Sequence, residues 1–277
     1  PKAGEVPSSA RVTQVQVAPL SSDIDSEQII ISTPAVDMAI ALNGGDITQV
    51  LLKKFPVSLK NQGQPIPLLD YVARTYFAQS GLVGTDGPDA STDGRPIYKA
   101  VRQRYDITEA TDISMQTTTD KGLIITKTFT VDPASYHIKV KHTIQNTSDT
   151  ARTVSPFVQL KRDNSADPSV QNSMGMQAFL GFALRTADER YRKVSFSDFE
   201  TAIDARELNT ELKDNIAAGG YLALLQHYFT SAWVPSADQT HLYSFRTNQD
   251  GHFIGSIISP NIVIPAGDTK HTVATFY

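Results

Sequence analysis

The stretch Ser80–Tyr98, "SGLVGTDGPDASTDGRPIY", gathers the residue types that could bind a phosphate or a metal ion, with four glycines and three aspartates. A phosphate-binding loop needs Gly-x-x-x-x-Gly-Lys-Ser/Thr and free N–H donors, but Pro88 follows Gly87 and removes one donor. A calcium loop of the EF-hand type needs acidic residues at alternate positions and a final glutamate. The aspartates at 86, 89 and 93 lack that rhythm. The stretch therefore predicts two Asp-Gly turns, with an irregular calcium site as the alternative.

The histidines and clustered aromatics are the next candidates for chemistry. His137 and His142 are five residues apart in an alternating segment, so they point to opposite faces of a strand and do not chelate together. His227, Tyr228 and Trp233 lie close together in "LLQHYFTSAW", and they could line a sugar-binding groove. The competing interpretation is a packed core at the end of a strand. Without an opposed carboxylate to pair with His227, no catalytic residue is assigned.

Other catalytic and ligand-binding motifs are missing. The chain has no cysteine, no Gly-x-Ser-x-Gly and no His-Glu-x-x-His. We therefore expect no metal, no cofactor and no enzymatic activity. The net charge of −4 also gives no basic field that would attract nucleic acid.

One basic concentration remains, formed by Arg185, Arg190, Arg192 and Lys193. It is a candidate contact face for a partner protein. Thr186 and Glu189 have the spacing of a capping box, which predicts a short surface helix over 186–194. The alternative interpretation is a solvated helix whose charges are matched by its own acidic residues. A second helical turn is expected within 198–214.

The elements that must position these residues are mostly strands. In the segment 135–146, apolar and polar residues alternate as in a strand with one buried face. Asn43-Gly44-Gly45-Asp46 separates two apolar runs and predicts a hairpin. Short β-branched runs between such turns predict an all-β sandwich or barrel.

The bulk properties favour one large domain. A chain of 277 residues, 40% of them hydrophobic, can build a large core. We expect residues 1–27 to form a flexible linker or a docked arm, and residues 28–277 to form a single domain. No apolar run reaches the roughly 20 residues that span a bilayer. Because the chain begins at Pro1 and ends within a predicted strand, we expect it to be part of a longer protein.

Several segments together resemble one known family. They are "ALNGGDITQVLL", "AQSGLVGTDGPDASTDGRPIY", "QLKRDNS", "TADERYRKVSF", "GGYLALLQHYFTSAWVP" and "IPAGDTKHTVATFY". In this order they resemble the large periplasmic domain of the bacterial YidC membrane protein insertases, from about Ile29 to Tyr277. "SGLVGTDGPD" and "QHYFTSAWVP" are the most specific of them.

This resemblance implies a β-supersandwich of two large antiparallel sheets, similar to galactose mutarotase, with one or two short surface helices. It also implies a longer protein anchored in the bacterial inner membrane through segments outside this chain. Such proteins insert and fold membrane proteins, alone or with the Sec translocon. The expected role is a non-catalytic scaffold or docking surface on the periplasmic side that contacts Sec components and nascent membrane proteins.

Two alternatives remain open from the sequence. A supersandwich could bind or process carbohydrate, because its fold is similar to that of sugar enzymes, although fold does not fix function. An exposed strand could instead capture an extended peptide at a sheet edge. In each case we expect the chain itself to be a monomer.

Overall fold

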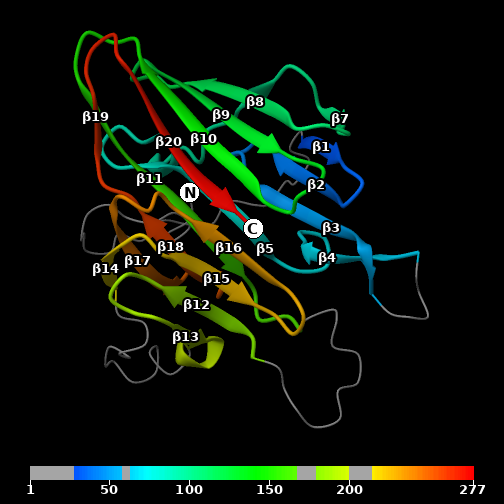
Figure 1. Ribbon diagram of the computed structural model, residues 1–277. Helices are drawn as coiled ribbons and strands as arrows, with labels where there is room; N and C mark the ends of the chain where they lie inside the picture. Colours follow the sequence, from blue (N-terminus) through cyan, green and yellow to red (C-terminus); the bar gives the residue numbers. More distant parts are fainter. Residues whose placement is uncertain (1–27, 58–62, 167–178, 200–213) are drawn as a thin grey trace.

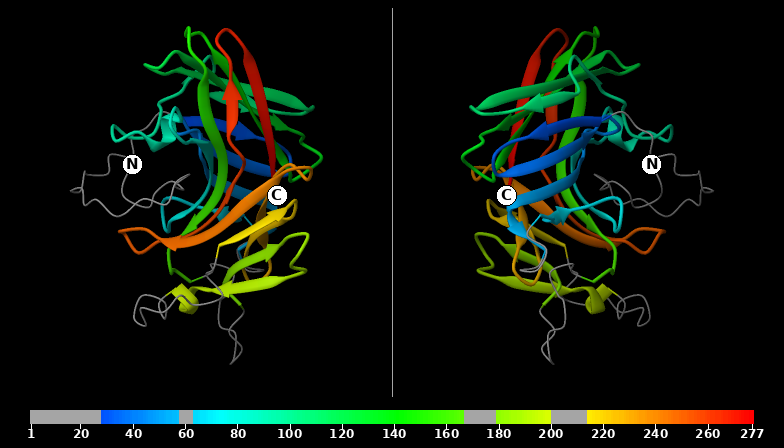
Figure 2. Two further views of the ribbon diagram at one scale, coloured as in Figure 1. Left: turned by 90° about the vertical axis from the view of Figure 1, so that its left-hand side faces the viewer. Right: turned by 90° about the vertical axis from the view of Figure 1, so that its right-hand side faces the viewer.

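The computed structural model describes residues 28–57, 63–166, 179–199 and 214–277, and the expected linker over 1–27 lies outside these ranges. Two large, mainly antiparallel sheets stack face to face (Figures 1 and 2). The predicted β-supersandwich is therefore confirmed. No helix in the described part of the chain is long and apolar enough to cross a membrane.

Within the described residues, the first sheet has 11 strands in the order β14-β17-β18-β11-β5-β3-β2-β1-β7, with β4 paired to β3 and β19 to β11. In chain order its strands are β1 (Gln28–Ser32), β2 (Val36–Ala41), β3 (Ile47–Pro56), β4 (Pro65–Leu69), β5 (Tyr76–Val83), β7 (Arg104–Asp106), β11 (Arg152–Arg162), β14 (Asn215–Ala218), β17 (Thr240–Thr247), β18 (Phe253–Ile258) and β19 (Ile262–Ile264). Its pairs are antiparallel except for β1 and β7, which run parallel at one edge.

The second sheet has 9 strands in the described part of the chain, in the order β13-β12-β15-β16-β20-β10-β9-β8-β6. Its strands are β6 (Lys99–Ala100), β8 (Thr111–Thr118), β9 (Leu123–Val131), β10 (Ile138–Asn146), β12 (Gly181–Arg185), β13 (Arg192–Ser195), β15 (Tyr221–Leu225), β16 (Thr230–Val234) and β20 (Thr269–Phe276). Since β6 and β7 follow each other in the chain, the connection between them passes from one sheet to the other.

Local patterns account for much of this architecture. Along β10, buried and exposed residues alternate, so the predicted buried face is confirmed. The predicted hairpin joins β2 to β3, and its Gly44 and Gly45 adopt φ of 72° and 64°, a region that glycine enters without strain. The inner faces of both sheets form one large apolar core. The one tryptophan, Trp233, packs there against Phe276 with ring centroids 5.2 Å apart.

The helix predicted over 186–194 is wrong. The segment is a turn that leads into β13, which pairs antiparallel with β12. The capping interaction does form, because the Glu189 N–H donates to Thr186 Oγ1 at 3.1 Å, but it closes the turn of a β-hairpin. Pairing with β12 buries Val194 completely, and this tertiary contact outweighs local helix preference.

Two short helical pieces lie elsewhere. A 3-10 helix spans Pro88–Ala90, and residues 196–199 are helical after β13. Most of the second expected helix, over 198–214, falls outside the described residues.

Candidate functional site, an apolar groove between the sheets

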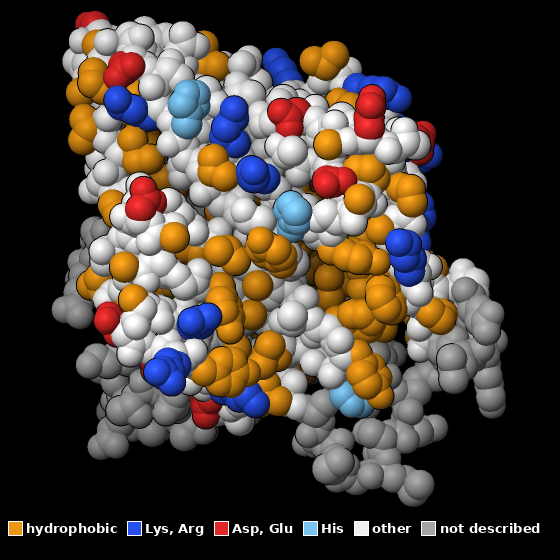
Figure 3. Space-filling model, in the orientation of Figure 1, with side chains coloured by type: hydrophobic (Ala, Val, Ile, Leu, Met, Phe, Trp, Pro, Cys, Tyr) orange, Lys and Arg blue, Asp and Glu red, His pale blue; other side chains and the backbone are white. Residues whose placement is uncertain are grey.

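A cavity of about 370 Å³ opens at the end of the sandwich where β2, β3 and β4 face β10 and β20. In the space-filling view, hydrophobic side chains surround a hollow in the surface (Figure 3). The lining residues are Val36, Met38, Val50, Leu52, Phe55, Leu68, Val131, Ser135, Tyr136, His137, Ile138, Tyr228, Phe229, Thr230, Phe276 and Tyr277. We call this cavity the apolar groove. It is open space bordered by inner-face residues of both sheets.

The groove lining carries no Asp, Glu, Lys or Arg among the described residues. Its polar groups are Ser135, His137, Thr230 and the tyrosine hydroxyls. A ligand would gain free energy here mainly by removing apolar surface from water, at roughly 25 cal/mol per Å². A charged group placed in the groove would be costly to desolvate. The lining therefore fits an uncharged, apolar ligand.

Partly exposed aromatic side chains form the rim. Phe55 is 42% exposed, Tyr136 45%, Tyr228 69% and Tyr277 51%. Single exposed apolar residues are ordinary on a protein surface, whereas several gathered around one cavity are typical of a binding surface. Phe55 also meets Phe229 edge to face at 5.4 Å, which connects β3 to the turn between β15 and β16.

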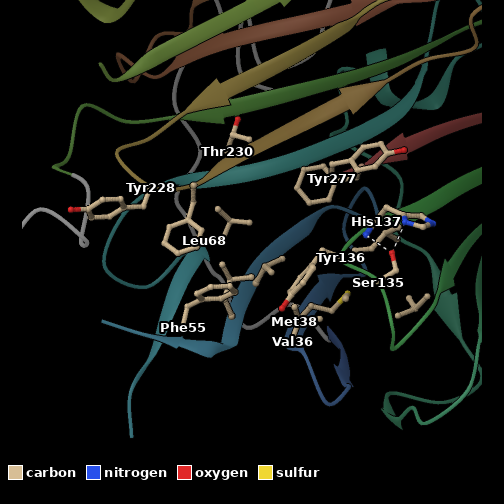
Figure 4. A pocket seen from close by; sticks show the side chains of 16 residues that line it. Val36, Met38, Phe55, Leu68, Ser135, Tyr136, His137, Tyr228, Thr230 and Tyr277 are labelled. Atoms are coloured by element: carbon tan, nitrogen blue, oxygen red, sulfur yellow. Dashed lines mark hydrogen bonds between the residues drawn. The ribbon is translucent and has the colours of Figure 1, made fainter. Parts of the chain in front are cut away.

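The turn between β9 and β10 places Tyr136 over the groove. Asp132 starts this turn, and its Oδ1 accepts the Ala134 N–H at 2.9 Å. Ser135 Oγ accepts the His137 N–H at 3.0 Å and also pairs with Nδ1 of the same histidine. These bonds fix the residues on both sides of Tyr136, and Figure 4 shows its ring extending toward Met38 and Phe55.

The three residues suggested for a sugar-binding groove lie in different environments. Trp233 is completely buried, and its Nε1–H donates to the Gln159 carbonyl at 3.1 Å. Its ring therefore presents no face to solvent. Tyr228 lines the apolar groove, whereas His227 lines a neighbouring cavity of about 340 Å³ and stacks on Tyr228 at 4.0 Å. Among the described residues, no Asp or Glu side chain lines either cavity.

The basic residues lie on the β12–β13 hairpin at an edge of the second sheet. Arg185 and Arg190 are exposed. Lys193 lies over the Phe179 ring at 4.8 Å. Arg192 is mostly buried, lies 3.5 Å from Glu189 and covers the Phe245 ring, so it belongs to the packing of the hairpin.

The stretch Ser80–Tyr98 has a structural role that its sequence did not reveal. Ser80–Val83 still belongs to β5, and the turns follow. Asp89 is then completely buried, where its carboxylate accepts the Leu82 N–H at 2.8 Å and the Arg95 Nε–H at 2.8 Å. A Cβ built on Gly81 would overlap the Asp89 carboxylate, so glycine is required at that position.

Arg95 connects this loop to the rest of the fold. Its guanidinium forms ion pairs with both Asp89 and Asp46 and donates to the Ser80 carbonyl at 2.9 Å. Lys127 of β9 donates to the same carbonyl at 2.9 Å and to the Gly44 carbonyl at 3.0 Å. We call Asp46, Asp89, Arg95 and Lys127 the buried ionic cluster.

Burial and charge shift the pKa values in this cluster. Burial lowers the pKa of Lys127 to about 7, although the nearby Asp46 carboxylate opposes the shift. Burial also opposes the charge of Arg95, but Asp46 and Asp89 outweigh it and raise the Arg95 pKa. Burial, followed by the charge of Lys127, lowers the pKa of His142 well below its ordinary value. Hydrogen bonds and ion pairs thus hold these ionisable side chains in the interior.

The aspartates of the loop diverge. Asp86 accepts the Thr153 N–H at 2.8 Å, Asp89 points inward and Asp93 is exposed. The described ranges contain no group of three His, Cys, Asp or Glu side chains that could hold a metal ion.

Several histidines are hydrogen-bonded to neutral groups. His241 uses Nε2 with the Ser236 carbonyl at 2.7 Å and Nδ1 with Ser259 Oγ at 3.1 Å. His271 pairs with Thr143 Oγ1 at 3.1 Å.

Comparisons define first the class of protein and then its family. The fold is similar to that of a galactose mutarotase-like protein from Lactobacillus casei, with a TM-score of 0.53, 8% sequence identity, and coverage of 90% of this chain and 99% of the other. At that identity the likeness shows the fold alone. The class is therefore a mutarotase-like β-supersandwich.

The family model for the YidC periplasmic domain matches residues 28–277. The chain is 38% identical over 276 residues to the membrane protein insertase YidC of Azotobacter vinelandii, covering 99% of this chain and 48% of that protein. It is 36% identical over 277 residues to the corresponding protein of Pseudomonas putida, with the same coverage. The chain belongs to the YidC periplasmic domain family, and it spans about half the length of these relatives.

Proposed function

We propose that the chain is a non-catalytic docking module on the periplasmic side of the inner membrane, and that its apolar groove receives an uncharged segment of a membrane-protein substrate during insertion or folding. The groove itself carries the proposal. In the part of the chain that the structure describes, its lining has no Asp, Glu, Lys or Arg side chain, and Tyr136 and Tyr228 stand partly exposed at its rim.

The family supports this choice of ligand. The relatives are named membrane protein insertases, and the proteins that an insertase handles expose long apolar segments. A cavity of about 370 Å³ holds a few apolar side chains rather than a whole helix. The expected contact is therefore brief and local, which suits a protein that must release its substrate.

Site-specific crosslinking in the full-length protein tests the proposal. A photoreactive phenylalanine analogue replaces Tyr136 or Tyr228 at the rim, and crosslinks to newly made membrane proteins are measured. Tyr191, a tyrosine that is 52% exposed near the basic hairpin, is the matched control. We expect crosslinks from the rim positions and few from the control. Equal crosslinking from all three positions, or none from the rim, would contradict the proposal.

A contact with Sec translocon components is a second, separate proposal. The β12–β13 hairpin supports it, because Arg185 and Arg190 are exposed there and Lys193 projects beside aromatic rings. Replacing Arg185 and Arg190 by glutamate should reduce crosslinks to Sec components without affecting crosslinks from the groove. Unchanged Sec crosslinks would remove the hairpin from consideration.

A further inference from the structure

The connection between β6 and β7 stands at the edges of both sheets. β6 pairs with β8 at the edge of the second sheet, and β7 pairs with β1 at the edge of the first. Residues 101–103 link these two edges and are exposed, as are Lys99 and Arg104 on either side. None of these residues lines the apolar groove. We call Ile97–Arg104 the edge loop.

The edge loop carries three cations without counterions. Lys99, Arg102 and Arg104 are exposed and form no ion pair with any residue of the described ranges. Arg102 instead lies over the ring of Tyr105 at 5.0 Å, which orients its guanidinium without neutralising it. No acidic residue occurs between positions 96 and 105. The exposed Asp106 beyond Arg104 offsets one of these three charges, so the loop is still a local positive surface in a chain with a net charge of −4.

Two exposed aliphatic side chains accompany the cations. Val101 is fully exposed and Ile97 is 62% exposed. A single exposed aliphatic residue is ordinary, but two within five residues among unpaired cations match the composition of segments that bind at a membrane interface. Such a segment places its apolar groups at the acyl boundary while its cations meet the headgroups.

We propose that the edge loop contacts a lipid bilayer, with Lys99, Arg102 and Arg104 on anionic phospholipid headgroups and Val101 inserted at the interface. A bilayer offers both a negative surface and an apolar phase, whereas an acidic soluble protein offers Val101 no comparable phase. The family's place beside the inner membrane brings the two surfaces together. This proposal does not depend on the groove.

We expect the edge loop to bind an anionic bilayer weakly, but strongly enough to orient the domain of a tethered protein. Each basic residue near an anionic surface strengthens binding about fivefold, so three give an enhancement of roughly 100-fold. That is modest for a free domain. In a protein already tethered to the membrane, the high effective concentration makes a weak contact sufficient to set the orientation of the domain.

Vesicle binding tests the electrostatic part. The chain is sedimented with vesicles of phosphatidylcholine alone and of phosphatidylcholine mixed with phosphatidylglycerol. We expect binding to the anionic vesicles, loss of binding at high salt, and an affinity about 25-fold lower for the R102Q/R104Q variant. K139Q/K141Q serves as the matched control, because it removes two exposed lysines on the outer face of β10 that form no ion pair with any residue of the described ranges. Equal losses in both variants, or equal binding to neutral vesicles, would overturn the proposal.

A fluorescent variant tests insertion. Val101→Trp adds an exposed indole to a chain whose one native tryptophan is completely buried. Its emission should shift to shorter wavelength with anionic vesicles, and soluble glycerophosphate should not produce the shift. A shift with glycerophosphate would indicate a small-anion site instead. No shift with vesicles would show that the loop does not insert, and either result contradicts the proposal.

Discussion

Strands β9 and β10 run from the buried ionic cluster to the apolar groove, and these two regions have opposite properties. On β9, Lys127 belongs to the cluster, and Val131, four residues along, lines the groove. On β10, His142 neighbours the cluster, while Ile138 lines the groove. All four side chains face the interior between the sheets. Lys127 and His142 are ionisable, whereas Val131 and Ile138 are aliphatic.

The difference comes from what covers each region. The Ser80–Tyr98 loop covers the cluster, and it supplies Asp89 and Arg95 to meet Asp46 and Lys127. In the groove, the described residues leave an open cavity bordered by partly exposed rings. The cluster thus holds the Ser80–Tyr98 loop against the strands, whereas the groove leaves the apolar surface that the proposed binding requires. We expect substitutions in the cluster to affect stability and those at the groove rim to affect binding.

The largest expected effect comes from Asp89→Ala. This change leaves Arg95 with one carboxylate partner and the buried Leu82 N–H without an acceptor. Breaking a buried ion pair from one side typically costs about 3–5 kcal/mol. Urea unfolding should show this loss, whereas Asp93→Ala, at an exposed position in the same loop, should stay within about 0.5 kcal/mol of the original chain. A small effect at Asp89 would mean that the cluster does not hold the loop.

Gly81→Ala should destabilise the fold by about 1–3 kcal/mol, because the new methyl group overlaps the Asp89 carboxylate and overpacks the site. The matched control is Gly63→Ala, where the added Cβ has no neighbour within 4 Å. Both variants are compared by thermal and urea unfolding. If the two variants lost equal stability, the overlap with the Asp89 carboxylate would not be the cause of the loss at Gly81.

The pH dependence of stability tests Lys127. Its pKa is about 7 in the folded state and ordinarily 10.5, so between these values the unfolded chain binds a proton that the folded chain lacks. The free energy of unfolding should therefore rise with pH above pH 7, by at most about 1.4 kcal/mol per pH unit from this group. Below pH 7 both states hold the proton and the slope from Lys127 disappears.

Lys127→Met should remove that rise, as measured by urea unfolding at several pH values between about 7 and 9. The Gly44 and Ser80 carbonyls keep Arg95 as a donor in this variant. An unchanged slope in Lys127→Met would show that another group titrates.

The smallest expected effect on stability is at the groove rim. Tyr228→Ser removes a ring that is 69% exposed, so stability should change by no more than about 0.5 kcal/mol. Crosslinking of substrate from a probe at Tyr136 should nevertheless fall, because the ligand loses apolar contact area. Tyr191→Ser is the matched control and should change neither quantity. A large loss of stability in Tyr228→Ser would contradict the proposal that the groove rim serves binding while the buried ionic cluster serves stability.

Local patterns predicted the strands but missed the cluster. The alternation along 135–146 and the glycines at 44–45 are patterns of neighbouring residues, so the strand and the hairpin could be predicted from them directly. Asp89 looked like an ordinary turn residue because its ion-pair partner Arg95 is shared with Asp46, which lies 43 positions from Asp89 in the chain. The signal that could have identified it is the unusual density of glycine around Asp89, since Gly81 makes room for its carboxylate.

The candidate groove was only partly visible in the sequence. Tyr228 was among the residues suggested for a groove, and it does line the cavity. Trp233 was also suggested, but its position on β16 turns the ring into the core. The helix predicted at 186–194 failed for a related reason: the local capping bond is compatible with both a helix and a tight turn, and strand pairing selected the turn.

The sequence by itself determined the all-β class, the hairpin at 43–46 and the family, because periodicity, turn residues and motif order are all properties of neighbouring positions. Only the tertiary structure decided which inward-facing residues are enclosed with charged partners and which border an open groove. The physical reason is that burial depends on segments far apart in the chain. A strand fixes the side to which a residue points, and the elements packed against that side decide whether it meets a carboxylate, another ring or open space.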